Sequence, residues 1–203
     1  MSNMPKTALI MIEFQRDFLD EKGALAGAGI WKRAKDHNIV GNMKKVLVAA
    51  RKAGPNKCLI IHSPISFREG YPELAKTHPG LLKGAEEAGG FKKGEWGAEI
   101  TDELKPQPGE TVLDKRRLCG FTDTELDGLL KNLGVENLMI GGFVTNWCVE
   151  ATGRSAYDRG YHPVFLKDCM DAFTDEEQKF AEEKIFPVIG EVLTSDEAMA
   201  KFL

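Results

Sequence analysis

Three residues whose side chains could do chemistry together lie at the ends of apolar runs. Glu13 closes the first run of the chain, Lys115 closes the third, and Cys148 lies just past the fourth. A thiol attacks a carbonyl carbon only after it loses its proton. A carboxylate can take that proton and return it later, and an ammonium group stabilises both anions. Singly, Glu13 and Lys115 fit a solvated surface; together with Cys148 they predict nucleophilic hydrolysis by a cysteine.

The neighbourhood of Cys148 favours a thiolate. The segment 141–152 reads GGFVTNWCVEAT, and Thr145 or Asn146 can cap the helix that follows. Cys148 then falls in the first helical turn, where free N–H groups and the positive end of the helix dipole favour an anion. The same N–H groups can bind the oxyanion of a tetrahedral intermediate. The alternative is that Cys148 is a small buried apolar residue.

The elements that must position these residues alternate between strands and helices. The alternation predicts a mostly parallel sheet with helices on both faces, and such sheets have their sites beyond the carboxyl ends of the strands. The irregular stretch 64–109 predicts a loop-and-helix insertion that shapes the site. The predicted strands are 7–13, 58–62, 111–115, 137–141, 162–167 and 188–193, and the predicted helices are 38–51, 123–132, 146–159 and 176–184.

Composition restricts the other possibilities. The chain has 203 residues, 42% apolar and 29% charged, with a net charge of −4, as expected of one globular domain spanning 1–203. No basic tract predicts nucleic-acid binding, and no apolar run approaches the roughly 18 residues of a membrane span. The start of the chain does not resemble a signal peptide. Four scattered cysteines without a CxxC pair predict reduced thiols and a cytoplasmic protein.

Three blocks of the chain resemble those of the isochorismatase-like cysteine hydrolase superfamily. The first reads Glu13-Phe-Gln15-Arg-Asp17-Phe18 and is similar to the family's D-x-Q-x-D-F segment. The second, 112–121, is similar to its lysine block, and the third, 142–161, to its nucleophile block. Asp168, at the predicted end of the fifth strand, also fits.

The resemblance implies a fold and a catalytic set. The fold is a three-layer α/β/α sandwich with a six-stranded, mostly parallel, Rossmann-like sheet, and family members are usually homodimers or homotetramers. The catalytic residues would be Glu13, Lys115 and Cys148, with Glu13 replacing the usual aspartate. A cis peptide at Phe143–Val144 would direct the Val144 and Cys148 amides at the oxyanion.

The resemblance also suggests substrate-binding residues. The segment 94–97 is similar to one that lies near the active site in relatives, sometimes from a neighbouring subunit. For each aromatic residue, core packing is the alternative. The predicted substrate-binding residues are Gln15, Phe18, Trp96, Phe121, Phe143 and Trp147.

The substrate class follows from what the family blocks contain here. Nicotinamidase-type members bind a metal through an Asp and several His, whereas this chain has only His62 after the second strand and His78 alone further on. The prediction is therefore no metal and no cofactor. A cysteine nucleophile implies C–N hydrolysis of a small amide, imide, ureido or carbamoyl compound through a thioester. The alternatives are an isochorismatase that releases pyruvate, and a non-catalytic binding member of the family with Glu13 in place of Asp.

Overall fold

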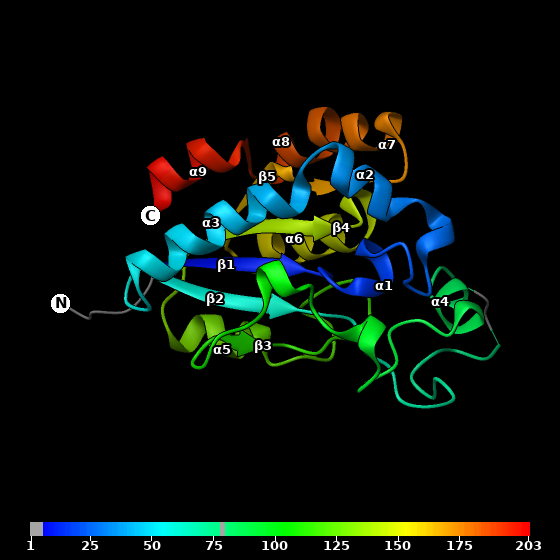
Figure 1. The fold of residues 1–203 in the computed structure, drawn as a ribbon. Coiled ribbons are helices and arrows are strands. Elements are labelled where there is room, and N and C mark those ends of the chain that lie inside the picture. The colour runs from blue at the N-terminus through cyan, green and yellow to red at the C-terminus, as the bar shows by residue number, and fades with distance from the viewer. Residues whose placement is uncertain (1–5, 78–79) are drawn as a thin grey trace.

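The computed structural model describes residues 6–77 and 80–203 (Figure 1). Within these ranges the strands are β1 (Thr7–Ile12), β2 (Cys58–Ser63), β3 (Thr111–Val112), β4 (Asn137–Phe143), β5 (His162–Asp171) and β6 (Glu191–Leu193). They form one sheet in the order β3-β2-β1-β4-β5-β6, and every neighbouring pair is parallel. The prediction of an α/β protein with a parallel sheet is confirmed.

The central strand β1 shows why the sheet needs continuous apolar runs. It pairs with β2 on one side and β4 on the other, and all six of its residues are buried. Leu9 and Met11 point to one core, while Ala8 and Ile10 point to the other. A strand covered on both faces has no place for alternating polar residues.

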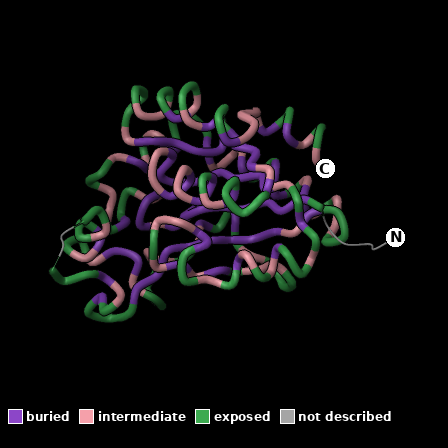
Figure 2. The backbone as a smooth tube through the Cα atoms, turned by 180° about the vertical axis from the view of Figure 1, so that it is seen from behind, coloured by how far each residue is buried: buried purple, intermediate pink, exposed green. Residues whose placement is uncertain are grey.

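Helices cover both faces of the sheet and make three layers. Helices α2 (Ile30–Asp36), α3 (Ile39–Ala53) and α9 (Ser195–Phe202) contribute to one core, and α5 (Leu126–Asn132), α6 (Glu150–Asp158) and α8 (Phe186–Ile189) to the other. Figure 2 shows the strands buried between these outer turns. The remaining helices are α1 (Arg16–Leu19), α4 (Lys83–Ala88) and α7 (Asp175–Phe180).

Two predicted strands have different ends. The third, predicted as 111–115, stops at Val112, and Lys115 continues alone as an isolated parallel bridge to Ile65. The fifth, predicted to end at 167, runs on to Asp171 past a register irregularity. Asp168 therefore lies inside the strand, where its carboxylate accepts hydrogen bonds from the N–H and hydroxyl of Ser195. The placement of Asp168 at the strand end was wrong.

Several helix boundaries also differ. The helix predicted from 146 begins as a π-helical turn, η4 (Thr145–Val149), and the helix predicted at 176–184 becomes a second π-helical turn, η5 (Ala181–Ile185), in its second half. The helix predicted from 123 starts at Leu126, and the last strand starts at Glu191 because Val188 belongs to α8. The insertion 64–109 contains α4 and the short 3₁₀ turns η2 (Trp96–Ala98) and η3 (Asp102–Leu104).

Among the described residues, no helix combines the length and apolar character that a membrane crossing requires.

Candidate active site

The structure brings Glu13, Lys115 and Cys148 together at the C-terminal edge of the sheet. Glu13 directly follows β1, with a left-handed φ of 56° and its N–H bonded to the carbonyl of Ser63 at 3.1 Å. The Lys115 ammonium donates hydrogen bonds to the Glu13 carboxylate and, at 3.0 Å, to the carbonyl of Arg117. Its charge also acts on Cys148, where it lowers the pKa of the thiol against the effect of burial. A carboxylate, an ammonium group and a thiol therefore share one buried cluster.

Burial and mutual charge decide the protonation of this cluster. Burial and then the Glu13 carboxylate raise the pKa of the Cys148 thiol, while Lys115 and a backbone hydrogen bond from Val144 act in the opposite direction. Burial favours the neutral amine of Lys115, but the charges of Cys148 and Glu13 and their hydrogen bonds leave its pKa raised. At rest, the Cys148 thiol is thus neutral and Lys115 is protonated.

The π-helical turn η4 sets the position of Cys148. The N–H groups of Trp147 and Val149 both donate to the carbonyl of Val144, at 3.0 and 3.3 Å, so the chain turns back directly after β4. The Phe143–Val144 peptide bond is cis. π-Helical turns are frequent at functional sites. The turn η4 places Cys148, which is 3% exposed, beside Glu13 at the wall of a pocket.

That pocket has a volume of about 220 Å³. Glu13, Cys148 and three other residues from the sequence analysis line it, namely Phe18, Val144 and Trp147. Trp147 packs against Phe173 with ring centroids 4.8 Å apart. The other lining residues are Leu25, Ala28, Ile65, Leu81, Leu82, Gly84, Ala85, Phe91, Leu118 and Phe173.

Four residues predicted to bind substrate lie elsewhere. Gln15 is buried, and its amide bonds to Ile65 and Ala98, so it joins the first block to the insertion. Phe143 packs edge-on against Phe14 in the core.

Trp96 is 46% exposed beneath the guanidinium of Arg16. Phe121 stacks on Tyr161 in the core on the α5 and α6 side. None of these four is among the described residues that line the pocket.

The sequence analysis did not identify which residues of the insertion 64–109 line the pocket. Leu81, Leu82 and Ala85 reach the pocket from in and around α4, and no local pattern marks them. Phe91 is held there because its N–H donates to the Asp17 carboxylate at 2.6 Å. Phe173 follows the end of β5, so the strand-end rule could have found it if the strand had been predicted at its full length.

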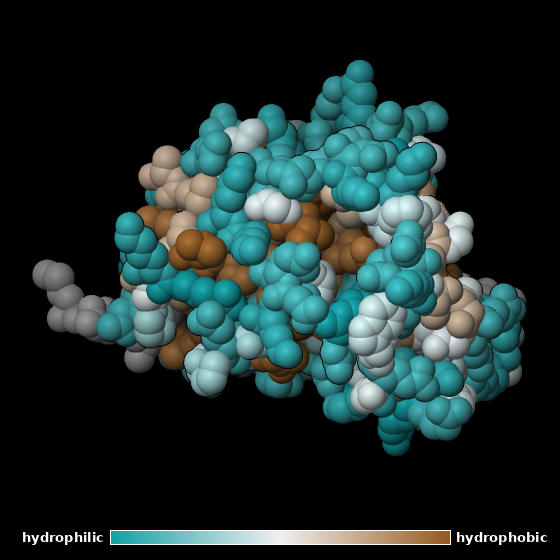
Figure 3. Space-filling model, in the orientation of Figure 1, coloured by the Kyte–Doolittle hydropathy of each residue, from teal (hydrophilic) through white to brown (hydrophobic). Residues whose placement is uncertain are grey.

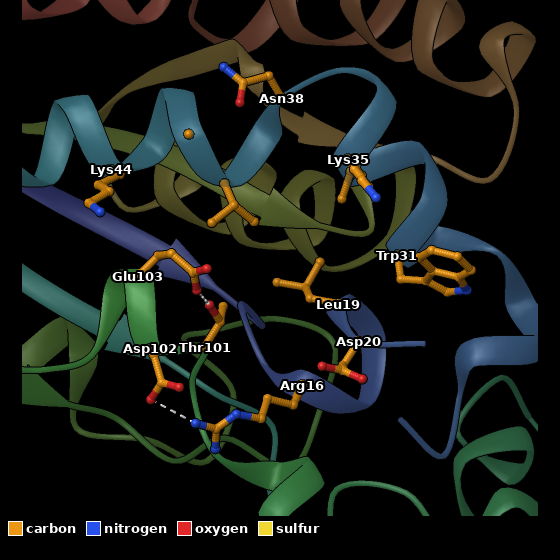
Figure 4. A pocket seen from close by; sticks show the side chains of 13 residues that line it. Arg16, Leu19, Asp20, Trp31, Lys35, Asn38, Lys44, Thr101, Asp102 and Glu103 are labelled. Carbon is orange, nitrogen blue, oxygen red and sulfur yellow. Dashed lines mark hydrogen bonds and ion pairs between the residues drawn. The ribbon is translucent and has the colours of Figure 1, made fainter. Parts of the chain in front are cut away.

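A larger pocket of about 560 Å³ lies between α1, α2, α3 and η3 (Figure 4). It carries charges of both signs, and its Arg16 is paired with Asp102 at 2.8 Å. Figure 3 shows this face as mostly hydrophilic, with hydrophobic side chains in the hollow at its centre. The nucleophile Cys148 lines the smaller pocket instead, so the smaller pocket is the candidate active site.

The described residues contain no group of three or more His, Cys, Asp or Glu that could hold a metal ion. His62 is occupied by Glu110, with Nε2 and Oε2 2.8 Å apart. His78 lies outside the described residues.

The protein is thus an α/β protein in which a buried thiol, ammonium group and carboxylate meet at the C-terminal edge of a parallel sheet, where the sites of such proteins lie. A family model described as "Isochorismatase domain" matches residues 7–197, and the chain belongs to this family of hydrolases.

Three similar proteins illustrate the relationship. The ureidoacrylate amidohydrolase of Pantoea ananatis is 33% identical over 80% of this chain and 68% of its own length. The crystal structure of a cysteine hydrolase from Pseudomonas syringae pv. phaseolicola superposes with a TM-score of 0.85 at 25% identity, covering 100% of this chain and 94% of that one. The N-carbamoylsarcosine amidase of Thermoplasma acidophilum gives a TM-score of 0.71 at 25% identity, covering 94% and 97%.

Proposed function

We propose that this protein is a cysteine hydrolase that cleaves the C–N bond of a small amide, imide, ureido or carbamoyl substrate. The observation that carries the proposal is the cluster itself, in which Glu13, paired with Lys115, shares the wall of an apolar pocket with Cys148. The amidohydrolases among its relatives support C–N hydrolysis as the reaction class.

The first half of the reaction forms a thioester. Glu13 takes the proton of the Cys148 thiol, and the thiolate attacks the substrate carbonyl carbon. The amides of Val144 and Cys148 receive the resulting oxyanion. The C–N bond then breaks, its electron pair goes to nitrogen, and Glu13 returns the proton to the departing amine or ammonia.

The second half releases the acid. Glu13 takes a proton from water, the hydroxide attacks the thioester carbonyl, and the Cys148 sulfur leaves and recovers a proton from Glu13. Lys115 stays protonated throughout, because its interactions with Cys148 and Glu13 outweigh burial and leave its pKa raised. The ammonium therefore stabilises whichever of Glu13 and Cys148 carries the negative charge.

The test is a hydrolysis panel of small amides, ureas and carbamoyl compounds together with isochorismate, read as ammonia, amine or pyruvate release. Wild type is expected to release ammonia or amine, Cys148→Ala to release none, and intact-mass measurement to show an acyl adduct on Cys148. Pyruvate release that survives Cys148→Ala would assign an isochorismatase instead. Ligand binding without turnover in wild type would assign a non-catalytic member of the family.

Assembly and location remain predictions. We propose a homodimer or homotetramer in the cytoplasm, to be measured by light scattering of the purified protein and by cell fractionation.

A further inference from the structure

The candidate pocket has almost no polar wall. Apart from Glu13 and Cys148, every described residue that lines it is apolar or glycine. Small-molecule sites normally carry a few polar groups that orient the ligand. Here, among the described lining residues, the only side-chain polar group besides those that carry out the reaction is the uncharged indole N–H of Trp147.

Lys115, the cation that pairs with Glu13, does not line the pocket. It donates to the Glu13 carboxylate and the Arg117 carbonyl, its side chain is fully buried, and it is not among the described lining residues. Its ammonium group is therefore not exposed to an anionic group of a substrate in the pocket.

Two other cations line an adjoining pocket. Arg117 and Lys83 line a neighbouring pocket of about 330 Å³. Arg117 donates to the carbonyl of Glu73 at 2.9 Å, and Lys83 lies 3.4 Å from a carboxylate oxygen of Glu86. Three leucines, Leu81, Leu82 and Leu118, line both pockets, whereas neither Arg117 nor Lys83 is among the described residues that line the candidate pocket.

A carboxylate placed in the candidate pocket would thus be buried without a counter-ion and beside the Glu13 carboxylate. Both effects oppose binding of an anion. An uncharged apolar group in the same place suffers neither the loss of hydration of a charge nor repulsion by the Glu13 carboxylate. The volume of about 220 Å³ exceeds the roughly 150 Å³ of an apolar cavity that accepts benzene, so a compact group of that size fits.

We infer that the substrate is an uncharged amide or urea whose substituent is a compact apolar group, and that carboxylate-bearing amides and ureido acids are excluded. This inference rests on the proposed C–N hydrolysis and specifies which members of that substrate class the site accepts.

The test compares pairs that differ only in a terminal methyl against a carboxylate. The amide pair is pentanamide and glutaramate, and the urea pair is N-propylurea and N-carbamoyl-β-alanine. The neutral member is expected to have a kcat/KM at least about 100-fold higher, because an unpaired buried charge is strongly disfavoured. Equal or higher kcat/KM for the carboxylate member, in a reaction abolished by Cys148→Ala, overturns the inference.

A substitution in the pocket wall is designed to shift the preference towards the carboxylate compounds. Leu82→Arg puts a cation on the pocket wall. It is expected to raise the kcat/KM of the carboxylate compound at least about tenfold relative to the kcat/KM of its neutral partner. Val188→Arg, at a residue of α8 that is 74% exposed, adds the same charge far from this pocket and should leave the ratio unchanged. If the Leu82 variant does not fold, as judged by thermal melting, Leu118→Arg takes its place. If neither Leu82→Arg nor Leu118→Arg changes the ratio of the two kcat/KM values, the inference is overturned.

A binding measurement separates failure of the inference from failure of the proposed function. Calorimetry on Cys148→Ser is expected to show binding of pentanamide and N-propylurea and none of the two carboxylates. If that pattern holds and wild type hydrolyses neither neutral compound, the proposed function fails, while the preference of the pocket for uncharged ligands stands. If neither neutral compound is bound or hydrolysed, the inference is overturned.

Discussion

Glu13 carries its carboxylate on one methylene more than the aspartate that the family resemblance predicts. The structure shows how the longer side chain is accommodated: Glu13 turns away from β1 with a left-handed φ of 56°, and its carboxylate reaches Lys115 directly. Non-glycine residues seldom adopt this conformation, and when they do it is often at a functional site. The contact with Lys115 thus depends on the length of the side chain as well as its charge.

Glu13→Asp is therefore expected to impair the enzyme. The shorter side chain withdraws the carboxylate by more than 1 Å, roughly, from Lys115 and Cys148, and a displacement of that size can cost about 100-fold in rate. The measurement is kcat on the best substrate of the panel, with Glu13→Gln as the control that removes the charge at full length. A gain of activity in Glu13→Asp would show that the native residue is a degenerate replacement.

Lys115→Met is expected to destabilise the fold as well as the site. It leaves the Glu13 carboxylate, 2% exposed, without its partner, and breaking a buried pair in this way typically costs about 3–5 kcal/mol. Urea unfolding measures the loss. The double variant Glu13→Leu/Lys115→Met removes both charges and should recover at least half of it, whereas an equally unstable double variant would contradict the charge explanation.

At the scale of elements, the close approach of β4 to β1 determines where the cluster forms. Gly142 has a φ of 133°, and a Cβ built on it would lie 2.0 Å from the carbonyl oxygen of Ile12, the residue just before Glu13. The backbone of β1 cannot move without displacing Glu13. A glycine is therefore required at position 142, near the end of β4 and three residues before the turn that carries Cys148.

Gly142→Ala is accordingly expected to lower the free energy of unfolding by at least about 2 kcal/mol, as steric clashes in a packed core do. Thermal unfolding measures this effect. Gly128→Ala is the matched control, because Gly128 lies in α5 with no atom near the position of a Cβ. There the same substitution should stabilise by up to about 1 kcal/mol through helix propensity, and a loss at both positions would contradict the steric argument.

The sequence predicted those elements whose signal is local. Buried strands such as β1 and β4 read as apolar runs, and α3 showed helical spacing, so the sheet and its catalytic edge could be predicted from the amino-acid sequence. The clustering of Glu13, Lys115 and Cys148 followed from the strand ends alone.

What the sequence did not reveal depends on contacts between distant segments. β3 is two residues long and pairs only with Ile61 and His62 of β2, about 50 residues earlier in the chain. Asp168 looked like a strand end but is held within β5 by Ser195, 27 residues later. Phe91 reaches the pocket through Asp17, 74 residues earlier. Periodicity within a window cannot report such partners.

At the scale of the whole molecule, one buried ion-pair network ties three separate parts of the chain. Glu110, just before β3, accepts hydrogen bonds from Arg51 of α3 at 2.6 Å and pairs with His62 of β2 at 2.8 Å. Burial alone would raise the pKa of Glu110, but hydrogen bonds from Arg51, the Gln107 N–H and His62 lower it to about 2. Burial lowers the pKa of His62, with Glu110 opposing. The network closes the insertion 64–109 against the sheet, and so fixes both ends of the segment that forms part of the pocket.

The free energy of unfolding should therefore decrease in two stages as the pH is lowered. His62 has a folded pKa below its unfolded value of about 6.5, so the unfolded chain binds the proton first and stability declines as pH drops below that value. Glu110 has a folded pKa of about 2, below its unfolded value of about 4.3, so its contribution is complete above pH 4.3, roughly, and is lost as pH falls towards 2.

Glu110→Gln tests the second stage. It should cost about 2 kcal/mol at neutral pH, as expected for lost hydrogen bonds to charged groups, and the difference from wild type should shrink between about pH 4 and pH 2. Urea unfolding at a series of pH values gives this difference directly. Glu136→Gln is the control, because the Glu136–Lys6 pair is exposed and should contribute less than about 1 kcal/mol at any pH. A Glu110→Gln difference that stays constant down to pH 2 would mean that packing of the side chain, and not its charge, joins the insertion to the sheet.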